Sequence, residues 1–299
     1  MRDKYMQHAP HYLRDILLTA IAPMLWGTTY ILTTQVLPPD RPYTAAVIRV
    51  LPAGLILLAW ARSLPARGWW LKLCVLAALN IGIFQAFLFI AAYRLPGGLA
   101  AIFGALQPLI TMALASFASR RSPGWRMIAV ALLGLPGMAM LLWSPGMQWD
   151  LTGVLAAFAG VCCVSAGAFL VRRWQPPMSV IALTGWQCAL GGFMLLPLAL
   201  LLEPALPALS LQQIAGYSYL SGFGALLAYV LWIRGIQKLP LAASSSLALL
   251  SPVVATILGW AILDQKLAAP AMAGMGIVLL SVYLVQREAA KPITPASNR

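Results

Sequence analysis

Ten apolar stretches, each of about 20 residues, follow one another along this chain of 299 residues and dictate how it can fold. Each stretch is long enough to cross about 30 Å of hydrocarbon as a helix, which pairs every backbone N–H and C=O internally. They cover roughly residues 14–36, 42–61, 70–93, 95–118, 125–143, 151–171, 178–202, 212–234, 239–262 and 268–286. The joins are short and proline-rich, so almost nothing remains for a soluble domain. The sequence therefore predicts an all-α membrane protein with ten transmembrane helices.

The basic residues are distributed unevenly over the joins. With the amino terminus placed in the cytoplasm, sixteen of the 20 Lys and Arg residues fall on the cytoplasmic side, Arg41, Arg94 and Lys266 fall outside, and Arg49 lies within a span. This asymmetry follows the positive-inside rule. We therefore expect a multi-pass protein of the cell inner (plasma) membrane with both termini cytoplasmic. The net charge of +13 then reflects topology and contact with anionic membrane lipid, and not a nucleic-acid partner.

Two proline-containing stretches repeat at one offset. Leu95-Pro96 recurs as Leu239-Pro240 and Pro108 recurs as Pro252, in each case 144 positions later. Because five spans make up each half, the second copy must enter the membrane from the opposite side. We expect two inverted five-helix repeats, residues 1–146 and 147–299, the second with a short cytoplasmic tail. A substrate site lies between such halves, and since one chain carries both, we expect a monomer.

Pro108 and Pro252 fall near the middle of the fourth and ninth spans. A proline inside a helix leaves the carbonyl four residues earlier without its donor, here at Gly104 and Ala248. Two such breaks at one depth predict paired hinges beside a central cavity, although tolerated kinks are the alternative. The predicted hinge or gating residues are Pro108, Pro252, Gly97, Gly98 and Ser244.

Polar and aromatic side chains at membrane depth are the candidates for a substrate cavity. Aromatic rings can stack on a flat apolar group while amides and hydroxyls bind the polar end of a zwitterion. Interhelical packing with hydrogen bonds is the alternative role for each of them. The candidates are Tyr30, Arg49, Asn80, Phe84, Gln85, Gln107, Trp186, Tyr229, Trp232 and Ser251.

Arg49 is the one charged residue well inside a span. A charge there is costly unless it is paired or faces water. It either attracts a substrate carboxylate or serves as a structural partner of Asp40, a helix end or a lipid phosphate. The seven acidic residues lie at or beyond span ends, which favours facilitated, gradient-driven transport over strict proton coupling. The spans also lack histidine and acids, so we expect no metal, no cofactor and no enzyme activity.

Several short motifs, in this order, resemble the drug/metabolite transporter superfamily in its ten-helix EamA-type exporter branch. They are Leu25-Trp26-Gly27, Pro38, Arg49, Ala228-Tyr229, Trp232 to Gly235, Leu239-Pro240, Ser251 to Ala255, Gly259-Trp260, Leu263 to Leu267 and Gly274. The resemblance implies two inverted five-helix repeats and export of small metabolites, and it is greatest to aromatic amino acid exporters. One departure is Gln265, where the family often has glutamate.

Together these features predict a secondary transporter that works by alternating access around a central cavity. Its predicted substrates are small metabolites, above all amino acids with large apolar or aromatic side chains. A broad-specificity drug or metabolite exporter is the alternative within transport. An integral-membrane enzyme is the alternative from another class, and the spans lack the paired acids, metal cluster or nucleophile with a base that it needs.

Overall fold

The computed structural model describes residues 9–95, 102–120, 123–142, 150–264 and 267–290, and across these ranges it contains helices and no strand. Nine of the helices in these ranges are long and apolar enough to cross a membrane. The shorter apolar segment Phe103–Ser119 lies where a further span is predicted. The all-α membrane fold predicted from the sequence is therefore confirmed. Gly97, Gly98 and Gln265 lie outside the described residues.

The chain up to residue 142 forms a first series of helices. These are α2 (Ala9–Gly27), α3 (Thr29–Gln35), α4 (Pro42–Ala61), α5 (Trp70–Ala77), the π-helical η2 (Ala78–Gly82), α6 (Ile83–Arg94), the short 3-10 helix η3 (Phe103–Leu106), α8 (Gln107–Ser119), α9 (Trp125–Leu132) and α10 (Gly134–Leu142). Pro42 begins α4, where its missing N–H costs no hydrogen bond and its fixed φ suits a first turn.

The second series begins at residue 151. It consists of α11 (Leu151–Trp174), α12 (Val180–Leu202), α13 (Leu211–Ser221), the π-helical η4 (Gly222–Leu227), α14 (Ala228–Lys238), α15 (Leu241–Leu247), α16 (Leu250–Leu263) and α17 (Ala269–Ala289). Side-chain caps fix three of the starts, since Asp150, Ser179 and Ser210 accept hydrogen bonds from backbone N–H groups in the first turns of α11, α12 and α13.

The offset of 144 positions found for the prolines also holds for the backbone. The π-helical segments begin at Ala78 and Gly222, and the helices that follow them end at Arg94 and Lys238. Beyond them, α8 and α16 are each closed by a residue in the left-handed region, Arg120 with φ 53° and Asp264 with φ 51°. Helix breaks, π turns and caps therefore recur at one spacing.

The expectation that Pro108 and Pro252 free the carbonyls of Gly104 and Ala248 is wrong. The fourth and ninth spans are not continuous helices, and each proline lies in the first turn of a new helix, α8 or α16. The amide of Gln107 donates to the Gly104 carbonyl, and the amide of Ser251 donates to the Ala248 carbonyl at 3.1 Å. A tight turn before each proline therefore satisfies the carbonyl that a continuous helix would have exposed.

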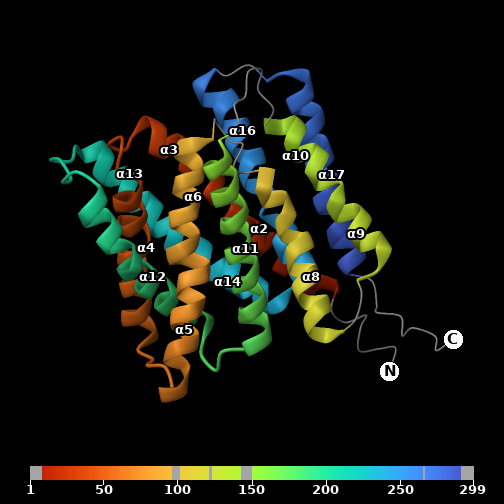
Figure 1. Cartoon of the computed structure of the whole chain (residues 1–299), viewed down its shortest axis with the longest axis horizontal. Coiled ribbons are helices and arrows are strands. Elements are labelled where there is room, and N and C mark those ends of the chain that lie inside the picture. The colour runs from red at the N-terminus through yellow and green to blue at the C-terminus, as the bar shows by residue number, and fades with distance from the viewer. Residues whose placement is uncertain (1–8, 96–101, 121–122, 143–149, 265–266, 291–299) are drawn as a thin grey trace.

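The helices pack as an upright bundle (Figure 1). The most extensive packing is between a helix of the first series and a helix of the second. α4 lies along α12, α6 along α11, α2 along α14, α8 along α15, and α9 with α10 along α17. Glycines permit the close approaches, because a Cβ on Gly54 would meet the backbone of Ala189 and one on Gly274 would meet the backbone of Gly137 and Leu141. Such contacts between small residues are what hold helices together in lipid.

The first and last helices meet at one end of the bundle. The Tyr12 hydroxyl, near the start of α2, donates to the backbone carbonyl of Gln286 near the end of α17, at 3.3 Å. The beginning of α2 and the end of α17 therefore lie on the same side of the bundle (Figure 1).

Candidate functional site

The two π-helical segments and the turns that follow them hold residues that lie in the interior. A π turn interrupts the regular ladder of hydrogen bonds and is often found at functional positions. Asn80 lies in η2 and Gly224 lies in η4, while Gln85 and Tyr229 follow in the next turns of α6 and α14. The candidate site is built around three of them, Gln85, Gly224 and Tyr229.

The carbonyl of Gly224 accepts two side-chain hydrogen bonds. Trp26 Nε1 from α2 and Arg49 Nη2 from α4 both donate to it, each at 3.0 Å. The guanidinium carbon of Arg49 also lies 6.0 Å from the centre of the Tyr229 ring, within the range of a cation–π interaction. The partner of Arg49 in this structure is therefore a helix carbonyl and an aromatic face, not Asp40.

Aromatic side chains cover one side of this cluster. The Trp26 ring lies 5.4 Å from that of Tyr229 and 5.2 Å from that of Trp232, measured between ring centres. Tyr229 and Trp232 are nearly fully buried. We call Trp26, Arg49, Gln85, Gly224, Tyr229 and Trp232 the central cluster. Trp26 and Gly224 are absent from the predicted site residues, although Leu25-Trp26-Gly27 was a recognised motif.

Several polar atoms in and near the central cluster have no hydrogen-bond partner among the described residues. Gln85 Nε2 donates to the Tyr229 hydroxyl at 3.4 Å, which leaves Gln85 Oε1 without a donor. Arg49 Nε has no acceptor either. Asn80 Nδ2 donates to Gln187 Oε1 at 2.7 Å, and Gln187 Nε2 is then unpaired. A buried polar atom left unpaired costs about 1–3 kcal/mol, so a ligand or a water molecule that reached these atoms would recover part of that free energy.

Gln107 and Pro108 lie in the first turn of α8, Ser251 and Pro252 lie in the first turn of α16, and Ser244 lies within α15. Ser244 is buried and donates to a carbonyl of its own helix. Gln107 is buried too, and its Nε2 finds no acceptor in the described part of the chain. Ser251 lies where α2 crosses α16, since a Cβ on Gly27 would come 2.7 Å from the Ser251 carbonyl.

Among the described side chains, Asn80, Phe84 and Trp186 lie outside the central cluster and outside these helix starts, and Asn80 bonds to Gln187. Trp186 donates through Nε1 to the Ser63 carbonyl at 3.1 Å and stacks edge-on against Trp70. Phe84 is half-buried and packs toward Gly160 of α11. Tyr30 belongs to α3, and its side chain is not among the described ones. The ranges that the structure describes contain no group of three His, Cys, Asp or Glu side chains able to hold a metal ion.

The chain is similar over most of its length to a family of transporters and to a solved structure. A model of the EamA-like transporter family matches residues 13–143 and 151–287. Protein PecM of Dickeya dadantii is 40% identical over 267 residues, covering 89% of this chain and 90% of PecM. The inner membrane transporter YedA of Escherichia coli K12 is 24% identical, covering 88% of this chain and 87% of YedA. A crystal structure shares the fold with a TM-score of 0.76 at 19% identity, covering 92% of this chain and 97% of its own.

Proposed function

This chain belongs to the EamA-like transporter family, and we propose that it is a secondary transporter of the inner membrane that exports amino acids with large apolar or aromatic side chains. It is a multi-pass membrane transporter by its family and its helices. The substrate class rests on the central cluster, and the inner membrane on the charge asymmetry and on relatives such as YedA.

The observation that carries the substrate class is the environment of Arg49. Its guanidinium is always charged, it lies between helices, and its described hydrogen bond goes to the neutral Gly224 carbonyl and not to an acid. A carboxylate is the natural ligand for such a fork of donors. Arg49 Nε is buried and has no described partner, so a carboxylate that enters when the helices move apart can bind there while Nη2 keeps its bond to Gly224.

The rings beside Arg49 define the other end of the substrate. Trp26, Tyr229 and Trp232 present aromatic surfaces in mutual contact, which suits a flat apolar side chain. Gln85 Oε1, whose acceptor lone pairs have no donor in the described structure, can accept from an α-amino group. A zwitterion with a large side chain satisfies all three features at once.

We further propose that the two halves are inverted repeats that open alternately to the two sides. The recurrence of π turns, helix ends and caps after 144 positions supports the repeat. Gln85 and Tyr229 are separated by the same 144 positions and contact each other. Equivalent residues of two halves meet in this way only near the axis that relates the halves, which is where a transporter of this kind binds its substrate.

Two ion pairs at opposite ends of the bundle fit this mechanism (Figure 1). Asp15 of α2 pairs with Arg234 of α14 at 2.5 Å, at the end proposed to be cytoplasmic. Arg94 at the end of α6 pairs with Asp150 at the start of α11 at 3.6 Å, at the other end. The first pair is the more buried of the two.

A competition assay tests the substrate class. Purified protein in proteoliposomes is given radiolabelled tryptophan, with excess phenylalanine, alanine, lysine, glutamate or a lipophilic organic cation as competitor. We expect phenylalanine to compete strongly and the other amino acids weakly. Strong competition by the organic cation instead would favour the broad-specificity exporter, and no uptake of any amino acid would reject the proposed substrate class.

A further inference from the structure

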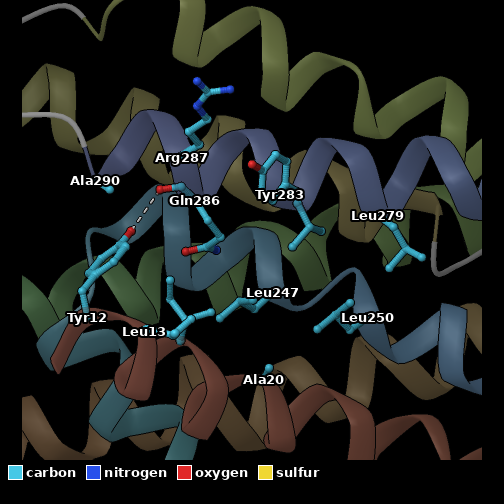
Figure 2. A pocket seen from close by; sticks show the side chains of 12 residues that line it. Tyr12, Leu13, Ala20, Leu247, Leu250, Leu279, Tyr283, Gln286, Arg287 and Ala290 are labelled. Carbon is cyan, nitrogen blue, oxygen red and sulfur yellow. Dashed lines mark hydrogen bonds between the residues drawn. The ribbon is translucent and has the colours of Figure 1, made fainter. Parts of the chain in front are cut away.

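A groove of about 500 Å³ lies at the side of the bundle, away from the central cluster (Figure 2). Its walls are the first turns of α2, the last turns of α17 and the break between α15 and α16. Its floor is apolar and is formed by Ile16, Ala20, Leu247, Leu250 and Val282. None of these residues belongs to the central cluster.

The groove opens toward the hydrocarbon of the membrane and not toward the interior of the protein. Leu13, Leu279 and Tyr283 at its edges are exposed by 57%, 43% and 61%, and they lie on helices that span the membrane. Apolar side chains exposed at that depth face lipid. An apolar groove in this position accommodates an acyl chain.

One end of the groove is polar. Gln286 is 9% exposed, and its Nε2 donates to the Ala243 carbonyl at 2.8 Å and to Ser246 Oγ at 3.1 Å. Gln286 Oε1 has no hydrogen-bond partner within the described ranges. The hydroxyl of Tyr12 lies beside it, bonded to the backbone carbonyl of Gln286. The site thus holds a buried acceptor that lacks a donor, next to a phenol.

The polar end is also basic. Arg287 lines the groove and is exposed, and Figure 2 shows its guanidinium extending away from the apolar floor, at the end of the groove where Tyr12 and Gln286 lie but across α17 from Tyr12. Asp15, the nearest acid on α2, is engaged by Arg234 of α14. Glu288 follows Arg287 but is not one of the residues that line the groove. Leu250, Leu279 and Ala20 lie toward the opposite end, so the polarity changes along the groove (Figure 2).

We propose that this groove is a binding site for an anionic phospholipid of the cytoplasmic leaflet, with a headgroup that carries hydroxyls. One acyl chain lies along Ile16, Ala20 and Leu250, and the phosphate lies beside Arg287. A headgroup hydroxyl supplies the donor that Gln286 Oε1 lacks. The apolar floor leads to an end that holds both an acceptor and an exposed cation, as the acyl chain of such a lipid leads to a phosphate and to the headgroup hydroxyls beyond it. The proposal is independent of the substrate of the transporter.

The test uses the purified full-length protein in detergent, titrated with phosphatidylglycerol or with phosphatidylcholine of the same acyl chains. Binding is read by native mass spectrometry and by the shift of thermal unfolding. We expect phosphatidylglycerol to bind and stabilise the protein, and Arg287→Gln to weaken this binding roughly tenfold, the effect of one lost charge-assisted hydrogen bond. The matched control, Arg126→Gln, removes an exposed cation from α9 and should leave binding unchanged.

A second variant tests the floor of the groove. Ala20→Phe fills the groove and should abolish the preference for phosphatidylglycerol, whereas Leu17→Phe, on the same helix but not lining the groove, should retain it. Equal binding of both lipids to the unmodified protein overturns the proposal. An equal loss in Arg287→Gln and Arg126→Gln overturns it as well, because the effect is then one of overall charge. If Ala20→Phe does not fold, the arginine pair decides.

Discussion

Gln85 Nε2 donates a hydrogen bond to the hydroxyl of Tyr229 at 3.4 Å, and 144 positions separate the two residues. The same spacing separates the Leu-Pro pairs, the starts of the two π-helical segments and the two left-handed caps. In the proposed repeat, Gln85 and Tyr229 therefore occupy equivalent places in the two halves, and they bind each other. One half contributes an amide and the other a phenol, so the two halves differ in chemistry where they meet.

A double-mutant cycle measures this contact. Tyr229→Phe removes the hydroxyl and keeps the ring beside Arg49, and Gln85→Leu removes the amide. We expect each change to lower the free energy of unfolding in bicelles by about 0.6 kcal/mol, the average for interhelical hydrogen bonds in a membrane. The double variant should lose less than the sum of the two. Effects that simply add would show that the two side chains do not interact.

Two glycines on α17 test the packing of α10 against α17. A Cβ on Gly274 would meet the backbone of Gly137 and Leu141, whereas a Cβ on Gly276 would meet nothing within 4 Å. We expect Gly274→Ala to destabilise the protein by more than 1 kcal/mol, since the helices must separate. Gly276→Ala should be neutral or stabilising by up to about 1 kcal/mol, because alanine is the better helix former. Thermal unfolding of the two variants side by side checks this, and equal effects would contradict the close contact.

The ion pair between Asp15 and Arg234 is expected to hold α2 against α14 at the end proposed to be cytoplasmic. Removing one partner leaves a half-buried charge unpaired, so Asp15→Asn should favour opening at that end. A cysteine placed near this end should then react faster with a membrane-impermeant thiol reagent added from the cytoplasmic side. The charge swap Asp15→Arg with Arg234→Asp should restore the slow rate. If the charge swap does not restore the slow reaction rate, the ion pair does not hold α2 against α14.

Substitutions at Trp26 and Trp186 test whether the central cluster, and not the surroundings of Trp186, binds the substrate. Trp26→Phe removes the donor to the Gly224 carbonyl and reduces the ring surface next to Tyr229. We expect the half-saturation concentration for tryptophan to rise by about tenfold, as for loss of one hydrogen bond and part of a stacked surface. Trp186→Phe, whose indole bonds to Ser63 instead, should leave it unchanged. An unchanged half-saturation concentration in Trp26→Phe, or an equal rise in both variants, would contradict this assignment.

The apolar spans and the spacing of the prolines made the helical membrane fold predictable. Residues 78–82 and 222–227 were not predictable as π turns, because ALNIG and GFGALL contain no residue that marks an interrupted helix. The turns before Pro108 and Pro252 were missed because a continuous helix was assumed across each proline.

The candidate site was predictable in its residue types more than in its contacts. Arg49, Gln85, Tyr229 and Trp232 were selected as polar or aromatic groups at membrane depth, and the structure brings these four together. The contact of Arg49 with Gly224 spans 175 positions and involves a backbone carbonyl, which a sequence pattern of side chains cannot reveal. Trp186 shares the residue type of Trp26 but lies beside Ser63 and Trp70. Both tryptophans lie within predicted spans, and only the packing of the helices shows which of them lies in the central cluster.

Arg49 is where the proposed substrate class can be tested most sharply, through the carboxylate that it is proposed to bind. In proteoliposomes, uptake of radiolabelled tryptophan is measured with unlabelled tryptophan or its decarboxylated analogue tryptamine as competitor. We expect tryptophan to compete with the unmodified protein at least tenfold better than tryptamine, and Arg49→Gln to lose that discrimination while keeping its thermal stability within a few degrees. Equal competition by tryptamine and tryptophan in the unmodified protein, or unchanged discrimination in Arg49→Gln, would contradict the binding of a substrate carboxylate by Arg49.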